Sequence, residues 1–67
     1  MQKDEVEKLI PEYISDGFEQ ITIELKDKNC IQINKNYSIV FSDNFLSIST
    51  IGYLFHIRYS FIKSISV

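Results

Sequence analysis

The sequence predicts a mainly β fold with one N-terminal helix: a helical segment over residues 1–17, then a five-stranded, strongly bent antiparallel sheet or small barrel over residues 18–67. Three observations lead to this class. The chain is short enough to be a single domain, its apolar residues first repeat with a helical period, and after residue 18 that period changes to two. Polar turn residues then recur about every ten positions, which is typical of the short strands of a small barrel.

Composition places the chain among globular proteins, because 45% of its 67 residues are hydrophobic and 24% are charged. A domain of this size removes only about 60% of its unfolded surface from water, so its core is small. The net charge of -2 is unevenly distributed. Residues 1–27 carry eight acids against three lysines, whereas residues 28–67 carry four cations against one acid. The second half is therefore mildly basic, which permits contact with a polyanion.

The N-terminal segment has the spacing of an amphipathic helix face. The apolar positions on that face are Val6, Leu9, Ile10, Tyr13 and Ile14. We expect a helix over roughly residues 4–15, with Asp4 and Glu7 as a capping box and Gly17 as its stop. Pro11 lacks a backbone donor, so we expect a kink there or two short helices. This segment is expected to cover one face or one mouth of the sheet.

From residue 18 onward, apolar residues alternate with polar ones in separate runs. The alternating positions are Ile21, Ile23 and Leu25; Ile31 and Ile33; Tyr37, Ile39 and Phe41; Leu46 and Ile48; Tyr53, Phe55 and Ile57; and Ile62, Ile65 and Val67. Turn residues at 26–29 and 43–44, and then Gly52, separate the strands. The polar residues at 34–36 could form a separate turn or a bulge, and we expect them to bend one long strand.

The chain offers little chemistry for catalysis or metal binding. Cys30 and His56 are the only cysteine and histidine, fewer than the three or four ligands that zinc needs. Cys30 is expected to be a small buried residue. Only one acid lies beyond residue 27, so no nucleophile has both a base and an orienting group. We expect no enzyme, no cofactor and no metal site.

Targeting signals are also lacking in the sequence. No basic N-terminal region precedes an apolar stretch, and no run approaches the length that crosses a bilayer. One cysteine cannot form an internal disulfide. The expected location is the cytoplasm, without a membrane partner.

Two short stretches of the chain, Ser42-Asp43-Asn44-Phe45 and residues 58–64, resemble motifs of a known family. The first is similar to the Asp-x-Phe loop of the Sm-like proteins, in particular the Hfq-like RNA chaperones. The second falls where that family carries a Tyr-Lys-His-Ala-Ile-Ser-Thr run. The order of one helix and five bent strands is also similar. The resemblance implies a homo-oligomeric ring, formed through edge strands by pairing the fourth strand of one subunit with the fifth of the next. It also implies single-stranded RNA as a ligand.

The chain departs from this family at functional positions. Tyr59 and Ser60 stand where the family has the lysine and histidine that contact uridines. The glycine usual in the bent second strand is also missing, and Asn34-Lys35-Asn36 lies nearby as a substitute.

These observations lead to a candidate site for single-stranded RNA. Its residues are Asn44, Phe45, His56, Arg58, Tyr59 and Ser60. Aromatic side chains would stack on bases, while His56 and Arg58, two residues apart on one strand, would face the same way and contact phosphate. The alternative is a small barrel that binds protein partners or has a structural role without nucleic acid.

Overall fold

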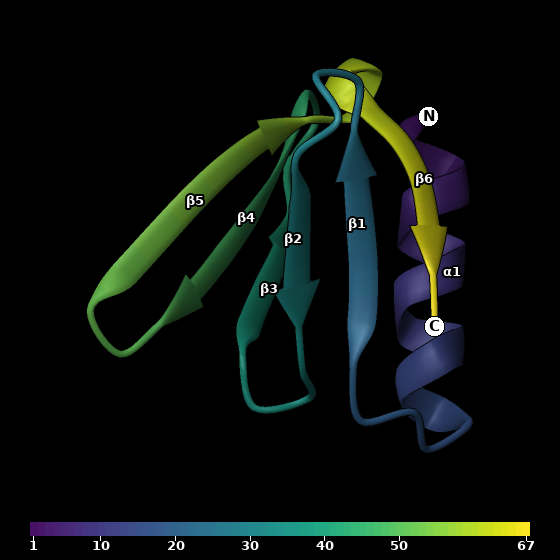
Figure 1. Cartoon of the computed structure of the whole chain (residues 1–67), viewed down its shortest axis with the longest axis vertical. Coiled ribbons are helices and arrows are strands. Elements are labelled where there is room, and N and C mark those ends of the chain that lie inside the picture. The colour runs from purple at the N-terminus through teal and green to yellow at the C-terminus, as the bar shows by residue number, and fades with distance from the viewer.

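A computed structural model describes all 67 residues and contains one α-helix and six strands (Figure 1). The elements in chain order are α1 (Lys3–Ser15), β1 (Ile21–Leu25), β2 (Cys30–Ile33), β3 (Ser38–Phe41), β4 (Phe45–Thr50), β5 (Tyr53–Arg58), the short 3-10 helix η1 (Tyr59–Phe61) and β6 (Ile62–Ser66). The predicted class, mainly β with one N-terminal helix, is confirmed.

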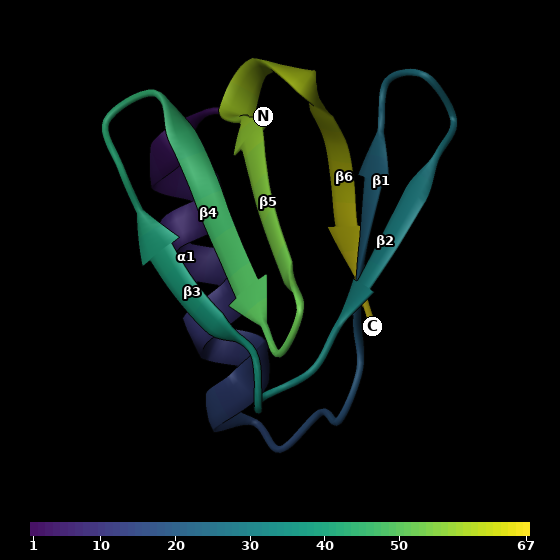
Figure 2. The same cartoon turned by 90° about the vertical axis from the view of Figure 1, so that its left-hand side faces the viewer.

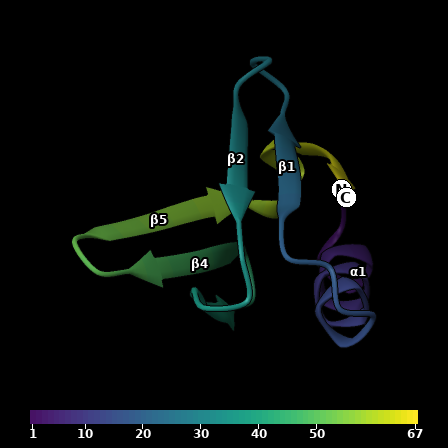
Figure 3. The ribbon, with the colours of Figure 1, turned by 60° about the horizontal axis from the view of Figure 1, so that its bottom comes forward.

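The strands form two three-stranded antiparallel sheets, with orders β2-β1-β6 and β3-β4-β5. No strand of one sheet is hydrogen-bonded to a strand of the other, and the strands of the two sheets cross at a steep angle (Figure 3). The chain passes between the sheets twice, at the β2–β3 turn and at η1 (Figure 2). These two connections hold the sheets around one core.

The structure has six strands in two sheets rather than five in one, because the polar stretch after β2 is a turn. The side-chain oxygen of Asn34 accepts a hydrogen bond from the Asn36 amide at 2.8 Å, and the Asn34 carbonyl accepts one from the Tyr37 amide at 3.1 Å. Asparagine readily forms such local bonds. The expected bend at residues 34–36 is therefore a break between β2 and β3.

Helix α1 begins earlier than expected and is one continuous helix. The Glu5 carboxylate accepts a hydrogen bond from the Gln2 amide at 3.3 Å, so the cap lies two residues before the predicted Asp4. Gly17 adopts a φ of 89°, a left-handed conformation that suits glycine at the end of a helix. Pro11 lies inside α1 on its exposed side, and the expected division into two helices is not found.

Pro11 gives the first testable prediction. A proline inside a helix costs about 3 kcal/mol relative to alanine, because it removes a backbone donor and crowds the preceding turn. Pro11→Ala is therefore expected to raise the free energy of unfolding by up to about 3 kcal/mol, measured by urea denaturation. The exposed Ser15→Ala variant, in the last turn of the same helix, is the control and should change stability by less than about 0.5 kcal/mol. Unchanged stability of the Pro11 variant would mean that α1 already accommodates the ring without strain.

One apolar core joins the helix and both sheets. Its buried members are Val6, Ile10, Ile21, Ile23, Leu25, Ile33, Leu46, Ile48, Ile57, Tyr59, Ile62 and Ile65. Every second residue of β1 is buried, as the alternation predicts. Helix α1 runs beside β6 and supplies the first two core residues (Figure 1).

Cys30 is exposed, so its predicted burial is wrong. The register explains the difference. Ile23 pairs with Ile31 on the inner face of the sheet, and Glu24 pairs with Cys30, which therefore points away from the core.

Candidate nucleic-acid interface

The six predicted site residues gather at one end of sheet β3-β4-β5, at the top of Figure 1. Asn44 and Phe45 lie where β4 begins, and His56 and Arg58 lie where β5 ends. Phe45 and Arg58 are directly paired across the two strands. The 3-10 helix that contains Tyr59 and Ser60 follows at once. The hairpin register thus brings the stretches 42–45 and 58–64 together.

A small contact cluster fixes the histidine on this surface. The rings of Phe45 and His56 meet edge to face with centroids 5.2 Å apart. The Ser47 hydroxyl lies 3.0 Å from Nδ1 of His56. Phe45 itself is 36% exposed, so part of its ring faces solvent. An exposed aromatic ring beside polar groups is suited to stacking on a base.

Tyr59 has a different position, because its side chain is only 5% exposed. Its hydroxyl donates a hydrogen bond to the Ser42 carbonyl at 2.7 Å. The α-amino group of Met1 donates to the carbonyls of Tyr59 and Ile62, at 3.1 and 2.6 Å. A buried ring cannot stack on a base, so Tyr59 acts by fixing η1 against the β3–β4 turn that carries Asn44.

The hydrogen bond of Tyr59 gives a second prediction. Burial raises the pKa of the Tyr59 hydroxyl above its ordinary value of 10.0, and the carboxylates of Glu7 and Asp43 raise the pKa further. The folded state therefore holds this proton more tightly than the unfolded state. The resulting stability is complete below about pH 10 and is lost as the pH rises through the folded pKa.

Tyr59→Phe tests both effects. At neutral pH the variant should lose about 0.5–1.5 kcal/mol of unfolding free energy with the hydrogen bond. Above about pH 10 it should lose less stability per pH unit than the wild type, as followed by thermal unfolding at each pH. Tyr53→Phe, at an exposed position, is the matched control. Parallel alkaline curves for the wild type and the Tyr59 variant would contradict the assignment.

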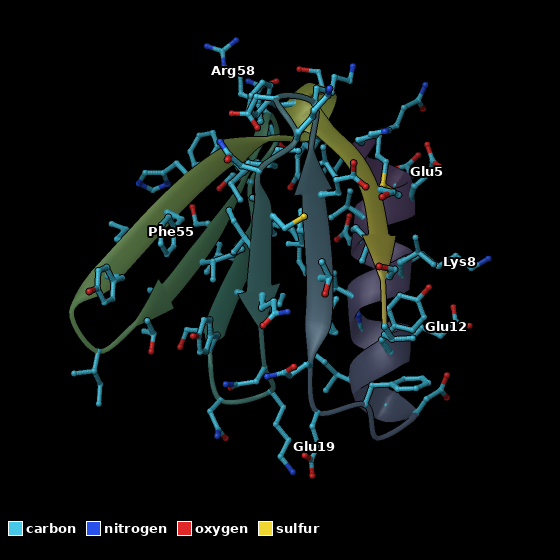
Figure 4. The ribbon with its side chains drawn as sticks, viewed as in Figure 1. Glu5, Lys8, Glu12, Glu19, Phe55 and Arg58 are labelled. Carbon is cyan, nitrogen blue, oxygen red and sulfur yellow. The ribbon has the colours of Figure 1, made fainter.

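Two further cations reach this end of the molecule, although no sequence motif indicates them. The amide of Lys26 donates to the Phe61 carbonyl at 3.0 Å, which holds the β1–β2 turn against η1. Lys26 and Lys28 are both exposed in that turn. Neither they nor Arg58 form an ion pair. Figure 4 shows Arg58 extending from the end of β5 into solvent.

An open apolar cleft of about 470 Å³ runs along β5, next to these cations. Its lining residues are Leu25, Ile31, Phe55, His56, Ile57, Arg58, Ser60 and Phe61. Phe55 is 38% exposed there and lies along the strand in Figure 4. Because four consecutive β5 residues line the cleft, it follows the free edge of that strand.

The structure contains neither a metal-binding cluster nor a membrane-spanning helix. No group of three His, Cys, Asp or Glu side chains is placed to hold a metal ion. Helix α1 lacks the length and the apolar run that a membrane crossing requires. No family model, curated protein or solved structure matches this chain. The geometry of the described residues is therefore the basis for a function.

Proposed function

We propose that this chain is an Sm-like, Hfq-like small barrel that assembles into a homo-oligomeric ring and binds single-stranded RNA. The observation that carries the proposal is the convergence of Phe45, His56 and Arg58 at one end of the molecule, next to Lys26 and Lys28. Aromatic rings that bind bases, surrounded by cations that bind phosphates, are the usual elements of single-strand recognition.

The arrangement of the strands supports the fold part of the proposal. If β2 and β3 are counted as two halves of one sharply bent strand, the order is one helix and five strands, as in the Sm-like proteins. The break at residues 34–37 would then be the bend. The first and last strands of that order pair with each other as β1 and β6.

Two free strand edges support assembly. β5 is an edge of one sheet, β6 is an edge of the other, and they open to opposite sides of the molecule (Figure 1). β5 carries no charge before Arg58, so the usual protection of an edge by charged side chains is weak. Pairing β5 of one copy with β6 of the next joins different surfaces, which produces a ring if the rotation closes.

Exposed apolar side chains beside both edges also support assembly. Tyr53 and Phe55 stack with centroids 6.2 Å apart along β5. On the side of α1 and β6, the exposed apolar residues are Ile14, Phe18 and Val67. A small domain gains stability by burying such surface against another subunit.

RNA titration followed by fluorescence anisotropy tests the binding part. Phe45→Ala is expected to weaken binding of an unstructured RNA by about 1–3 kcal/mol, the value of one stacked base. Ile51→Ala, which removes an apolar side chain that is 99% exposed at the tip of the β4–β5 hairpin, is the control. Affinity should also fall steeply as salt rises, because phosphate contacts release counterions. Equal affinities for wild type and the Phe45 variant would show that this ring does not stack on RNA.

The apolar cleft favours a second candidate, a small barrel that binds an extended protein segment along β5 without nucleic acid. Backbone pairing at a free edge and alternate side chains in a cleft are a common mode of peptide recognition. An affinity for a protein partner that depends only weakly on salt, together with no RNA binding, would favour this alternative.

A further inference from the structure

The face of sheet β3-β4-β5 that points to solvent carries a defined set of residues, because the register places them in rows. The rows, starting from the end that holds the candidate site, are Phe45 and Arg58; then Val40, Ser47 and His56; then Ser38, Ser49 and Leu54. We call these eight residues the outer face. Their neighbours Leu46, Ile48 and Ile57 point the other way into the core.

The outer face has no carboxylate, although the chain as a whole is acidic. Ser47 and Ser49 lie along its middle strand, and Ser38 lies beside Ser49 on β3. Val40 and Leu54 are 58% and 62% exposed on either side. The solvent face of the other sheet differs, because Glu24 lies there, 3.3 Å from Lys63 and 3.4 Å from Ser64. The outer face itself therefore combines polar hydroxyls, apolar surface and the positive charge of Arg58. The carboxylate of Asp43, in the adjoining β3–β4 turn, lies 3.7 Å from the ammonium group of Lys3.

His56 is held in one orientation in the middle row of this face, on the edge strand β5. Nδ1 is bonded to the Ser47 hydroxyl, and the edge-to-face contact with Phe45 fixes the ring. A neutral imidazole carries its hydrogen on one nitrogen only. If the Ser47 hydroxyl donates to Nδ1, the hydrogen lies on Nε2, which has no partner within the protein. Arg58 lies two residues away on the same side, at a rise of about 7 Å.

We infer that single-stranded RNA bound at Phe45 continues along the outer face, with its phosphates on Arg58 and on Nε2 of His56 and its next base on Leu54. Ser47 is the positioning residue for His56. This inference rests on the proposed function and extends the site by about 13 Å along the strands. It follows from the continuity of the outer face with Phe45 and from the charge complementarity between that face and a phosphate backbone.

A matched pair of charge substitutions tests the path. Leu54→Glu places a carboxylate on the outer face, and Gln32→Glu places one on the exposed solvent face of the other sheet. Both variants are titrated with the same RNA after thermal unfolding shows that they are folded. Leu54→Glu is expected to weaken binding by roughly tenfold or more, and Gln32→Glu by less than about twofold. Equal losses of RNA affinity for the two variants would mean that net charge alone weakens binding. That result would overturn the inference that RNA follows the outer face.

A double-mutant cycle tests the histidine. His56→Gln is expected to lower affinity roughly tenfold through loss of a bond to a charged group. Ser47→Ala should lower it less, and should add nothing in the His56→Gln background because it acts through His56. Additive effects would overturn the positioning role.

The failures of the two proposals can be distinguished. If RNA binds and Phe45→Ala weakens it while Leu54→Glu and His56→Gln do not, the path is wrong and the proposed function stands. If the wild type binds no RNA under low salt, both are wrong.

Discussion

Ile23→Ala is expected to lower the free energy of unfolding by about 2–5 kcal/mol, the usual range for a fully buried isoleucine or leucine. Ile23 lies in the middle strand of its sheet, pairs with Ile31 on one side and Ile65 on the other, and has no exposed surface. The helix and both sheets share one core, so no other packing unit compensates for the loss.

This loss is large relative to the total free energy of unfolding of the chain. Stabilities of about 0.05–0.15 kcal/mol per residue give this chain roughly 3–10 kcal/mol, so the variant should lose a large fraction of its stability and unfold at a much lower urea concentration. Ile51→Ala is the matched control, because Ile51 is 99% exposed at the tip of the β4–β5 hairpin. It should change stability by less than about 0.5 kcal/mol. Urea unfolding at one fixed protein concentration measures both, since assembly would make stability concentration-dependent. Equal losses for the two variants would contradict the assignment of the core.

Phe55→Lys is expected to convert the proposed oligomer into monomers. Phe55 lines the cleft along the free edge of β5, and a lysine there would bring a charge into the surface that the next subunit would cover. Charged side chains on an edge are the way natural sheets prevent edge pairing. Light scattering after size exclusion measures the mass directly, across a range of protein concentrations.

Leu54→Lys is the control for this experiment. Leu54 is adjacent in sequence and more exposed, but it points to the other face of the same strand. It should leave the mass unchanged. A wild type that is monomeric at every concentration would contradict ring assembly, whereas an oligomer that survives Phe55→Lys would show that subunits meet elsewhere.

The sequence predicts most of the elements because their apolar periods are clear. The helix face and the alternation in β1 correspond to the buried positions in the structure. The period of the apolar residues could not show whether the chain bends or turns between β2 and β3. That period stays at two across the turn, at Ile31, Ile33, Ile39 and Phe41. Only the local bonds of Asn34 show that the chain changes sheets there.

The site is predicted less completely, and the reasons are physical. The hairpin register that pairs Phe45 with Arg58 could be inferred from a turn at residues 51–52. The burial of Tyr59 could not, because η1 interrupts the alternation at that residue and turns its side chain inward. Lys26 and Lys28 were missed because a single backbone bond to Phe61, distant in the sequence, brings their turn to this end.

The pairing of β1 with β6 has a consequence for how the chain folds. Strands β3, β4 and β5 are consecutive and pair through short connections, so they can form early from local contacts. Sheet β2-β1-β6 needs the last strand of the chain, and Ile23 meets Ile65 only after a long loop has closed. Such distant pairings form slowly. We therefore expect the amides that join β1 to β6 to remain unprotected from hydrogen exchange until β6 docks, while the local β4–β5 hairpin is protected first.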